Sequence, residues 1–458
     1  MNLTQPDWAI DAVFYHIYPL GFCGAPRRND FKSAPLDRLE KVGRWLPHVR
    51  ALGANALYLG PLFESSAHGY DTADYYHVDR RLGANADLAR LSAEIHAGGM
   101  RLILDGVFNH VGRDFWAFRD LQQNGPASPY AGWFEGVRFD AQSPYGDAFT
   151  YQPWEGHYDL VQLNLRNPQV REHIFEAVRT WVNKFAIDGL RLDVAYCLDM
   201  DFLRELAAFC RALKADFWLL GEVVHGDYAQ WANPQTLDSV TNYEAFKGLY
   251  SSLVDKNYFE IAYSLNREFG PEGIYKDIPL YNFVDNHDVD RVAGRFSNPA
   301  LLRPLYLLLF TMPGVPSIYY GSEWGLAGSR TPQDDSALRP CLELAEMERS
   351  APQPDLPQFI QRLAALRAAL PALRHGAYRQ LFVSHEQLAF ARFTADQYVV
   401  VLSNAAGQPA AFDLQLPENT VEAVDVLNGN KRWPIERGHL RVDAVDAHWG
   451  AILELGRD

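Results

Sequence analysis

The chain has 458 residues and a formal net charge of −15, with 57 Asp and Glu against 42 Lys and Arg. Hydrophobic residues make up 48% of it, which excludes a disordered protein, and the acidic balance argues against a nucleic acid or an anionic membrane as partner. Aromatic residues reach 13%, which fits a well-filled core and leaves open that some rings line a groove for a ligand with flat apolar faces, such as a sugar.

Short apolar runs alternate with longer helical patterns along most of the chain. Strands are expected at residues 13–19, 56–62, 101–108, 189–195, 218–224, 239–243, 281–284 and 315–320, and helices at 36–52, 87–97, 170–185, 201–213, 300–310 and 356–370. Several strands are continuously apolar, as is typical of parallel strands buried on both faces. This βα alternation predicts an α/β fold, a (β/α)₈ TIM barrel formed by residues 1–109 and 166–372. A doubly wound sheet would look similar, but its Gly-rich phosphate fingerprint is missing after the first strand.

Two segments interrupt this alternation. Residues 110–165 are rich in Gly, Pro and aromatic residues and have no helical period, which predicts an irregular domain B inserted after the third strand. Residues 378–383, 387–393, 398–402 and 421–427 are short alternating runs. They predict a separate C-terminal antiparallel β-sandwich domain, residues 373–458.

Several classes of protein are disfavoured by what the sequence contains. The cysteines, Cys23, Cys197, Cys210 and Cys341, are scattered, which fits neither a disulfide scaffold nor a zinc site. The first eight residues carry no basic run followed by an apolar run, so no signal peptide is expected. The most apolar stretch, 301–320, is interrupted by Pro and Gly and predicts no membrane span. We expect a cytoplasmic protein.

Charged residues gather at the carboxyl ends of the predicted barrel strands, where a barrel enzyme places its chemistry. Asp105 ends the third strand, Asp193 the fourth, Glu222 the fifth and Asp288 follows the seventh. A single buried carboxylate could be a helix cap or half of an ion pair. Several at equivalent ends of one barrel indicate function.

Paired carboxylates without a metal cluster suggest cleavage of an acetal, which needs one carboxylate as nucleophile and a protonated second one as acid. Arg191 shares a strand face with Asp193 and should lower the pKa of that carboxyl, which suits a nucleophile. Glu222 follows an apolar run that should raise its pKa, which suits an acid. Asp288 would be a third carboxylate that holds substrate hydroxyls.

These strand ends resemble the signature regions of the α-amylase family, glycoside hydrolase family thirteen. The matching segments are residues 105–110, 189–193, 221–222 and 284–288, in the family's order, with flanking matches at 15–19, 68–75 and 312–321. The resemblance covers essentially the whole chain. It implies a retaining mechanism with Asp193 as nucleophile, Glu222 as acid/base and Asp288 as transition-state stabiliser, and a separation of about 5–5.5 Å between the two reacting carboxyls.

The resemblance also implies a set of substrate-binding residues: Tyr70, His110, Arg191, His287, Asp335 and Arg339. In the family, the tyrosine stacks on the sugar at subsite −1, the two histidines hold its hydroxyls, and the first arginine orients the nucleophile. Asp335 and Arg339 would form a clamp at subsites −1 and −2. The alternative for this pair is an exposed i,i+4 ion pair.

Local features resemble the neopullulanase, cyclomaltodextrinase and maltogenic amylase group. They are residues 160–164, residues 221–225, and Val194 directly after the nucleophile. In that group they accompany cleavage of α-1,4 and in some members α-1,6 bonds. The resemblance therefore implies an oligosaccharide substrate, a maltooligosaccharide or a cyclodextrin. Two alternatives stay open: an α-glucosyl transferase or isomerase (a glucanotransferase or a trehalose-forming enzyme) using the same site, and a silent sugar-binding subunit, which the three retained carboxylates disfavour.

The sequence also departs from the group. The group's N-terminal dimerisation domain does not fit before a first strand near residue 13, so we expect a monomer. Tyr196 and Cys197 replace the Lys-His pair of starch-acting amylases, which removes an acceptor contact and a histidine of the usual calcium site. Asn109 alone makes no calcium site, since calcium takes six to eight oxygens. We predict no catalytic metal and no required cofactor, and a structural calcium stays open.

Overall fold

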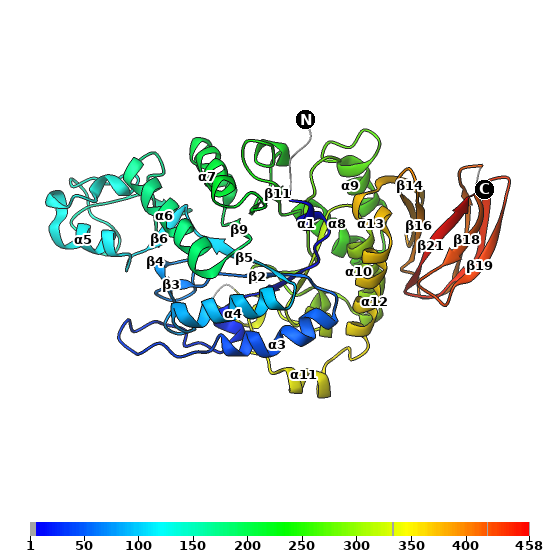
Figure 1. The fold of residues 1–458 in the computed structure, drawn as a ribbon, viewed down its shortest axis with the longest axis horizontal. Coiled ribbons are helices and arrows are strands. Elements are labelled where there is room, and N and C mark those ends of the chain that lie inside the picture. Colours follow the sequence, from blue (N-terminus) through cyan, green and yellow to red (C-terminus); the bar gives the residue numbers. More distant parts are fainter. Residues whose placement is uncertain (1–5, 332–333, 419, 458) are drawn as a thin grey trace.

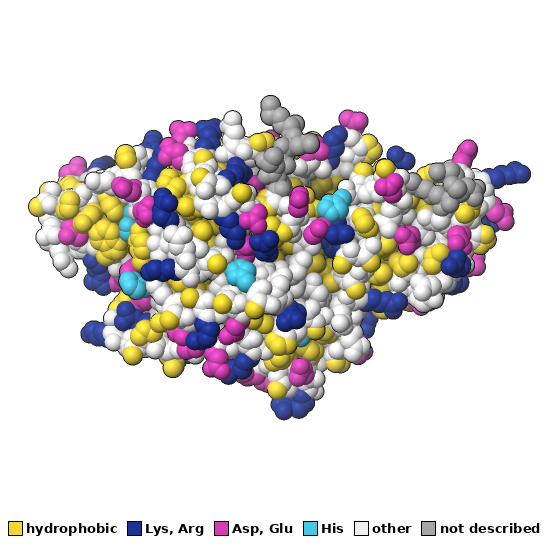
Figure 2. Space-filling view, viewed as in Figure 1, with side chains coloured by type: hydrophobic (Ala, Val, Ile, Leu, Met, Phe, Trp, Pro, Cys, Tyr) yellow, Lys and Arg dark blue, Asp and Glu magenta, His cyan; other side chains and the backbone are white. Residues whose placement is uncertain are grey.

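The computed structural model describes residues 6–331, 334–418 and 420–457. This range excludes residues 1 and 458, which are the outer limits of the expected domains. It also excludes the first residues of the segment in which no signal peptide is expected. Among the described residues, no helix is both long and apolar enough to cross a membrane. Figure 2 shows basic and acidic side chains interspersed over the face in view.

One parallel eight-stranded sheet forms the centre of the molecule, in the order β11-β10-β9-β5-β2-β1-β13-β12. A parallel bridge between Thr241, directly after β11, and Tyr281 of β12 brings the two edges of the sheet together, so the sheet closes into a barrel (Figure 1). The predicted TIM barrel is confirmed. Its strands are β1 (Phe14–Ile17), β2 (Ala56–Leu59), β5 (Arg101–Gly106), β9 (Gly189–Leu192), β10 (Trp218–Gly221), β11 (Ser239–Val240), β12 (Tyr281–Asn282) and β13 (Val315–Tyr319).

Helices surround the barrel. The longer ones are α3 (Glu40–Ala51), α4 (Asn85–Ala97), α6 (Pro168–Phe185), α7 (Met200–Leu213), α8 (Tyr243–Val254), α9 (Phe259–Phe269), α10 (Leu302–Thr311) and α12 (Leu356–Ala369). The shorter ones are α1 (Asp7–Ile10), α2 (Pro19–Phe22), α11 (Leu344–Ser350) and α13 (Pro371–His375). Asp199 begins α7 because its side chain accepts from two free N–H groups of the first turn. The helix expected from residue 36 begins only at Glu40, because the backbone N–H groups of Leu36 and Leu39 bond to the segment that follows β4.

The segment after β5 forms a lobe at one end of the molecule (Figure 1). It contains β6 (His110–Gly112), α5 (Trp116–Asn124), β7 (Pro153–Trp154) and β8 (His157–Gln162), and next to it lies the hairpin of β3 (Phe63–Ser65) and β4 (Thr72–Val78). The expectation of no helix here is wrong, because α5 has nine residues. Its buried side chains, Ala117, Phe118 and Leu121, share one face, and the ring of Phe118 packs against Tyr151 at 5.0 Å.

A second, antiparallel eight-stranded sheet lies at the other end of the molecule, in the order β14-β15-β16-β21-β18-β19-β20-β17 (Figure 1). Its strands are β14 (Ala377–Val383), β15 (Gln387–Phe393), β16 (Tyr398–Asn404), β17 (Ala410–Gln415), β18 (Thr420–Asp425), β19 (Lys431–Glu436), β20 (His439–Val445) and β21 (Trp449–Arg457). Phe382 and Phe412, on the first and last strands of this order, lie 6.0 Å apart, so the sheet folds over its own core. Buried Arg392 joins it to the barrel by donating to the carbonyl of Thr311 at 2.7 Å.

A buried carboxylate holds the amino-terminal side of the barrel together. Asp188, directly before β9, is 1% exposed and accepts from His96 at 2.8 Å, Arg101 at 2.8 Å, Lys214 at 2.6 Å and the N–H of Leu102 at 2.8 Å. Burial opposes the charge, but these donors outweigh it and hold the pKa of Asp188 well below its usual range. Residues at this side of a TIM barrel serve stability rather than chemistry.

Replacing Asp188 by Asn should therefore lower the free energy of unfolding by about 3 kcal/mol near pH 7. Because the folded-state pKa is depressed, this contribution is present above the unfolded pKa and is lost as the pH falls, so the difference from the wild type should shrink below about pH 4. Urea unfolding at both pH values measures it. Asp216→Asn is the matched control, since Asp216 also binds Arg101 but is 43% exposed, and it should cost less than about 1 kcal/mol. Equal effects of the two variants would contradict the assignment.

Candidate active site

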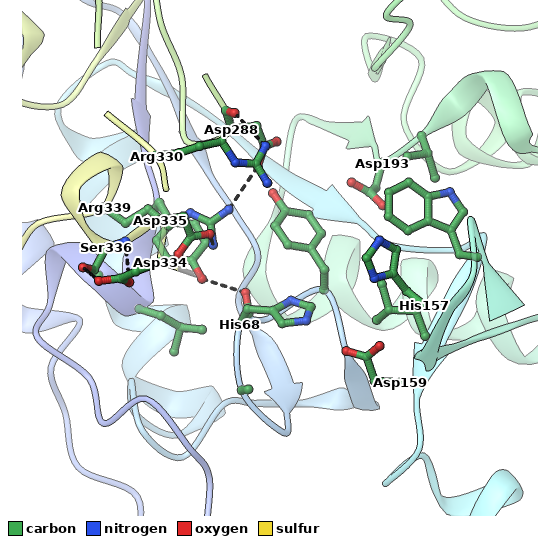
Figure 3. A pocket seen from close by; sticks show the side chains of 18 of the residues that line it. His68, His157, Asp159, Asp193, Asp288, Arg330, Asp334, Asp335, Ser336 and Arg339 are labelled. Carbon is green, nitrogen blue, oxygen red and sulfur yellow. Dashed lines mark hydrogen bonds and ion pairs between the residues drawn. The ribbon is translucent and has the colours of Figure 1, made fainter. Parts of the chain in front are cut away.

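A cavity of about 1030 Å³ opens at the carboxyl ends of the barrel strands. Its wall includes seven of the nine predicted site residues: Tyr70, His110, Asp193, Glu222, Asp288, Asp335 and Arg339. The other two, Arg191 and His287, do not line the cavity and contact the residues that do. In Figure 3, Asp193 and His157 lie on one side of this cavity and Asp334, Asp335 and Ser336 on the other. Strands far apart in the sequence thus contribute to one site.

One buried guanidinium connects the carboxylates of three neighbouring strands. Arg191 Nη1 lies 2.9 Å from Asp193 Oδ1 and 2.9 Å from Asp105 Oδ1, and its Nη2 lies 2.8 Å from Glu222 Oε2. The Arg191 side chain is 4% exposed. Glu222 Oε2 also accepts from the N–H of Val194 at 3.0 Å. Arg191 therefore holds Asp193 and Glu222 next to each other. The two residues come from adjacent strands, with their side chains on the same side.

The protonation of Asp193 differs from what the sequence predicts. Arg191 does lower the pKa of this carboxyl, but burial raises it, and so do the neighbouring carboxylates of Glu222, Asp105 and Asp288. The raising effects win, and the pKa of Asp193 lies well above its ordinary value. The prediction that Asp193 has a lowered pKa beside Arg191 is therefore wrong in its net direction.

Asp288 lies in a corner between a histidine and an arginine. His287 Nε2 is 2.9 Å from its Oδ2, and Arg339 Nη2 is 3.0 Å from its Oδ1. Burial raises the pKa of Asp288, but His287 and Arg339 outweigh burial and hold it well below its usual range. Arg339 Nη1 also binds Asp335 Oδ2 at 2.7 Å. The Arg339 side chain is only 11% exposed, so this pair is not the exposed helical ion pair considered as its alternative.

Aromatic rings line the same side of the cavity. Tyr70 stacks on His287 with centroids 5.4 Å apart and planes 9° apart, and its hydroxyl donates to Asp105 at 3.1 Å and contacts His287 Nε2. His110 Nε2 is buried with no hydrogen-bond partner among the described residues and lies 3.8 Å from Asp193 Oδ2. Burial lowers the pKa of His110 to about 3, so this ring is neutral near pH 7.

Other cavity residues are absent from the sequence prediction. The hydroxyl of Tyr243, at the start of α8, donates to Glu222 Oε1 at 3.4 Å. Trp154 of β7 lines the cavity with its ring 5.4 Å from that of His110. Arg28 and Arg330 come from loops. The sequence carries no signal for these residues, because no motif places their loops beside the strand ends.

The residues present do not fit a calcium ion. No group of three or more His, Cys, Asp or Glu side chains that could hold a metal occurs in the described part of the chain. The side-chain amide of Asn109 is buried against His110 Nδ1 at 3.1 Å, and Cys197 is a free thiol. We therefore derive no step through a metal.

Comparisons of this chain with family models, with known proteins and with solved structures agree with one another. Residues 17–351 match the family described as alpha amylase, catalytic domain, and residues 378–447 match the neopullulanase-like C-terminal domain. Neopullulanase 2 of Thermoactinomyces vulgaris is 32% identical over 99% of this chain and 79% of its own length. Two solved structures are similar over 99% of this chain and 100% of theirs. They are cyclic alpha-maltosyl-(1→6)-maltose hydrolase from Arthrobacter globiformis (29% identity, TM-score 0.82) and the debranching enzyme of Nostoc punctiforme (30%, TM-score 0.83).

Proposed function

The chain belongs to the α-amylase family, and we propose that it hydrolyses α-1,4-glucosidic bonds, and also α-1,6 bonds, in maltooligosaccharides and cyclodextrins. The observation that carries this proposal is the binding of Asp193 and Glu222 to the two terminal nitrogens of one buried guanidinium, at the wall of a cavity large enough for several sugar units. This arrangement supports the short carboxyl separation that a retaining glycosidase needs.

In the proposed reaction, Asp193 Oδ attacks the anomeric carbon while the carboxylic acid of Glu222 gives its proton to the leaving glycosidic oxygen. The C–O bond to the leaving sugar breaks and a glycosyl ester of Asp193 forms. The Glu222 carboxylate then takes a proton from water, whose oxygen attacks the anomeric carbon and frees Asp193 with retained configuration. This reaction requires a protonated Glu222 and an ionised Asp193 at its start. Arg191, at 2.9 Å, favours an ionised Asp193.

The remaining residues bind and orient the substrate in this proposal. Tyr70 offers a ring face to the reacting sugar, while His110 Nε2, which has no described partner, donates to or accepts from a sugar hydroxyl. Asp288 accepts from hydroxyls of the same sugar and stabilises positive charge developing on its ring. His287 acts through Asp288 and Tyr70, which it contacts. Asp335 and Arg339 clamp the donor chain.

Cleavage of α-1,6 bonds is supported by two observations. The names of the Arthrobacter and Nostoc relatives describe action on an α-1,6-linked maltose ring and debranching, respectively. On the leaving-group side of this cavity, Val224 is 41% exposed, so the wall next to Glu222 is formed by a small side chain. A branched acceptor therefore finds room beside the acid.

Product analysis over time on maltotriose, β-cyclodextrin, pullulan and soluble starch tests this function. We expect maltose and glucose from the two small substrates at rates above that on starch. Action on starch with none on the small substrates would refute the substrate assignment. Main products longer than maltotriose would instead identify the transferase alternative.

The proposal also covers the cellular compartment, the oligomeric state and the cofactor requirement of the enzyme. The four cysteines are free thiols, which supports a reducing compartment such as the cytoplasm, where imported oligosaccharides are met. We propose a monomer that needs no cofactor. Gel filtration with light scattering measures the oligomeric state. Activity after treatment with a chelator measures whether a metal is required.

A further inference from the structure

Four arginines line the cavity of a strongly acidic protein: Arg27, Arg28, Arg330 and Arg339. The same cavity is lined by carboxylates: Asp159, Asp193, Glu222, Asp288, Asp334 and Asp335. What matters is how many of these guanidiniums are already neutralised by carboxylates of the chain.

Two of the arginines have acidic partners. Arg339 binds Asp288 and Asp335, as described above. Arg27 lies 3.5 Å from Asp334 Oδ1, and Asp334 also accepts from the N–H and hydroxyl of Ser336. The two carboxylates on this side of the cavity, Asp334 and Asp335, are therefore engaged.

The other two arginines have none. Arg28 and Arg330 are both exposed, and neither is in an ion pair with a carboxylate of the described residues. Among the described residues, the one side-chain contact of Arg330 is a long one of 3.5 Å from Nη1 to the carbonyl of Asp288. Neither guanidinium thus has a carboxylate partner within the part of the chain that the structure describes.

Arg28 and Arg330 lie on the donor side of the site. Arg330 lies beside Asp288 in Figure 3, and the pair of Arg27 with Asp334 brings the loop of Arg28 beside the loop of Asp335. Asp288 and Asp335 are the residues to which the proposed function assigns the donor sugars. The leaving-group side, around Tyr196 and Val224, has no arginine in its wall.

We propose that the cavity accepts α-glucan oligosaccharides that carry a phosphate monoester on the donor sugars, with Arg28 and Arg330 binding the phosphate. The inference rests on the proposed function and adds a substrate class to it. A phosphate monoester carries nearly two negative charges near pH 7 and three acceptor oxygens, which matches two guanidinium forks. A sugar carboxylate, with one charge, would neutralise only one of them.

The test compares three trisaccharides: maltotriose, maltotriose phosphorylated on O6 of its non-reducing glucose, and maltotriose phosphorylated on O6 of its reducing glucose. At low salt, kcat/KM for the donor-end phosphate should exceed that for maltotriose by about tenfold or more. The reducing-end phosphate should show no such advantage. Added NaCl should reduce the advantage, because exposed charges are screened.

Arg28→Ala and Arg330→Ala should each reduce the ratio of kcat/KM between the donor-end phosphate and maltotriose by about tenfold. Arg441→Ala is the matched control, since Arg441 lies on β20, far from the cavity in the fold, and is 81% exposed. The control should leave the ratio unchanged. Arg28 is exposed, so its variant should fold, and the ratio corrects for any loss of active protein.

The outcomes distinguish a failure of the phosphate-binding inference from a failure of the proposed function. If wild-type enzyme cleaves maltotriose but shows no preference for the donor-end phosphate, the inference is wrong and the proposed function stands. A preference that survives both arginine substitutions also overturns the assignment to Arg28 and Arg330. If neither maltotriose nor any α-glucan of the product analysis is cleaved, the proposed function itself fails.

Discussion

Replacing Asp193 by Asn is expected to lower kcat on maltotriose by about 10⁴-fold or more while the protein stays folded. The amide has nearly the shape of the carboxylate but cannot form the glycosyl ester. The site should stay assembled, because Arg191 keeps its contacts to Asp105 at 2.9 Å and to Glu222 at 2.8 Å. Steady-state kinetics and a thermal unfolding curve of the same sample measure both properties.

A matched control and a rescue make this test specific. Asp201→Asn changes an exposed carboxylate on α7, 74% exposed, and should keep full activity. Asp193→Gly opens a space at the nucleophile's position, where added azide should attack α-maltosyl fluoride and yield maltosyl azide. Substantial activity of the Asn variant, or rescue of the Gly variant without incorporation of azide, would refute the assignment of Asp193 as nucleophile.

The sequence predicted the barrel and the place of the candidate catalytic residues for the same physical reason. Continuous apolar strands of a parallel sheet all end at one face, so polar residues directly after each strand meet there whatever the intervening sequence. Asp193 and Glu222 directly follow β9 and β10, Asp288 lies in the loop after β12, and all three line one cavity. Helix α5 was missed because it is short and lies among Gly, Pro and aromatic residues that mask its apolar face.

What the sequence could not predict depends on contacts between distant segments. The local motif shows Arg191 beside Asp193, but the groups that reverse the expected pKa shift, Glu222 among them, come from other strands. Arg28 and Arg330 are ordinary loop residues in the sequence, and only the folded chain brings them to one cavity. Half of the strands of the C-terminal sheet were missed in the same way, since β19 contains Pro434 and β20 has mostly exposed residues.

Replacing Glu222 by Gln should lower kcat/KM on maltotriose by about 10²–10⁴-fold, because the leaving glycosidic oxygen no longer receives a proton. The loss should largely disappear in the first step with α-maltosyl fluoride, since fluoride leaves without protonation. The glycosyl ester of Asp193 should then accumulate, because the glutamine cannot deprotonate the attacking water. A burst of fluoride followed by slow turnover, and a mass increase of one maltosyl unit on the protein, measure this. Absence of both would exclude Glu222 as the acid/base.

The Glu222→Gln variant also tests how Glu222 affects the pKa of Asp193. Glu222 is one of the carboxylates that raise the pKa of Asp193, and glutamine carries no charge. A nucleophile with a lower pKa stays ionised to lower pH, so the acid limb of the first step should move to lower pH in Glu222→Gln. An acid limb that stays in place would mean that burial, and not the neighbouring carboxylate, sets the protonation of Asp193.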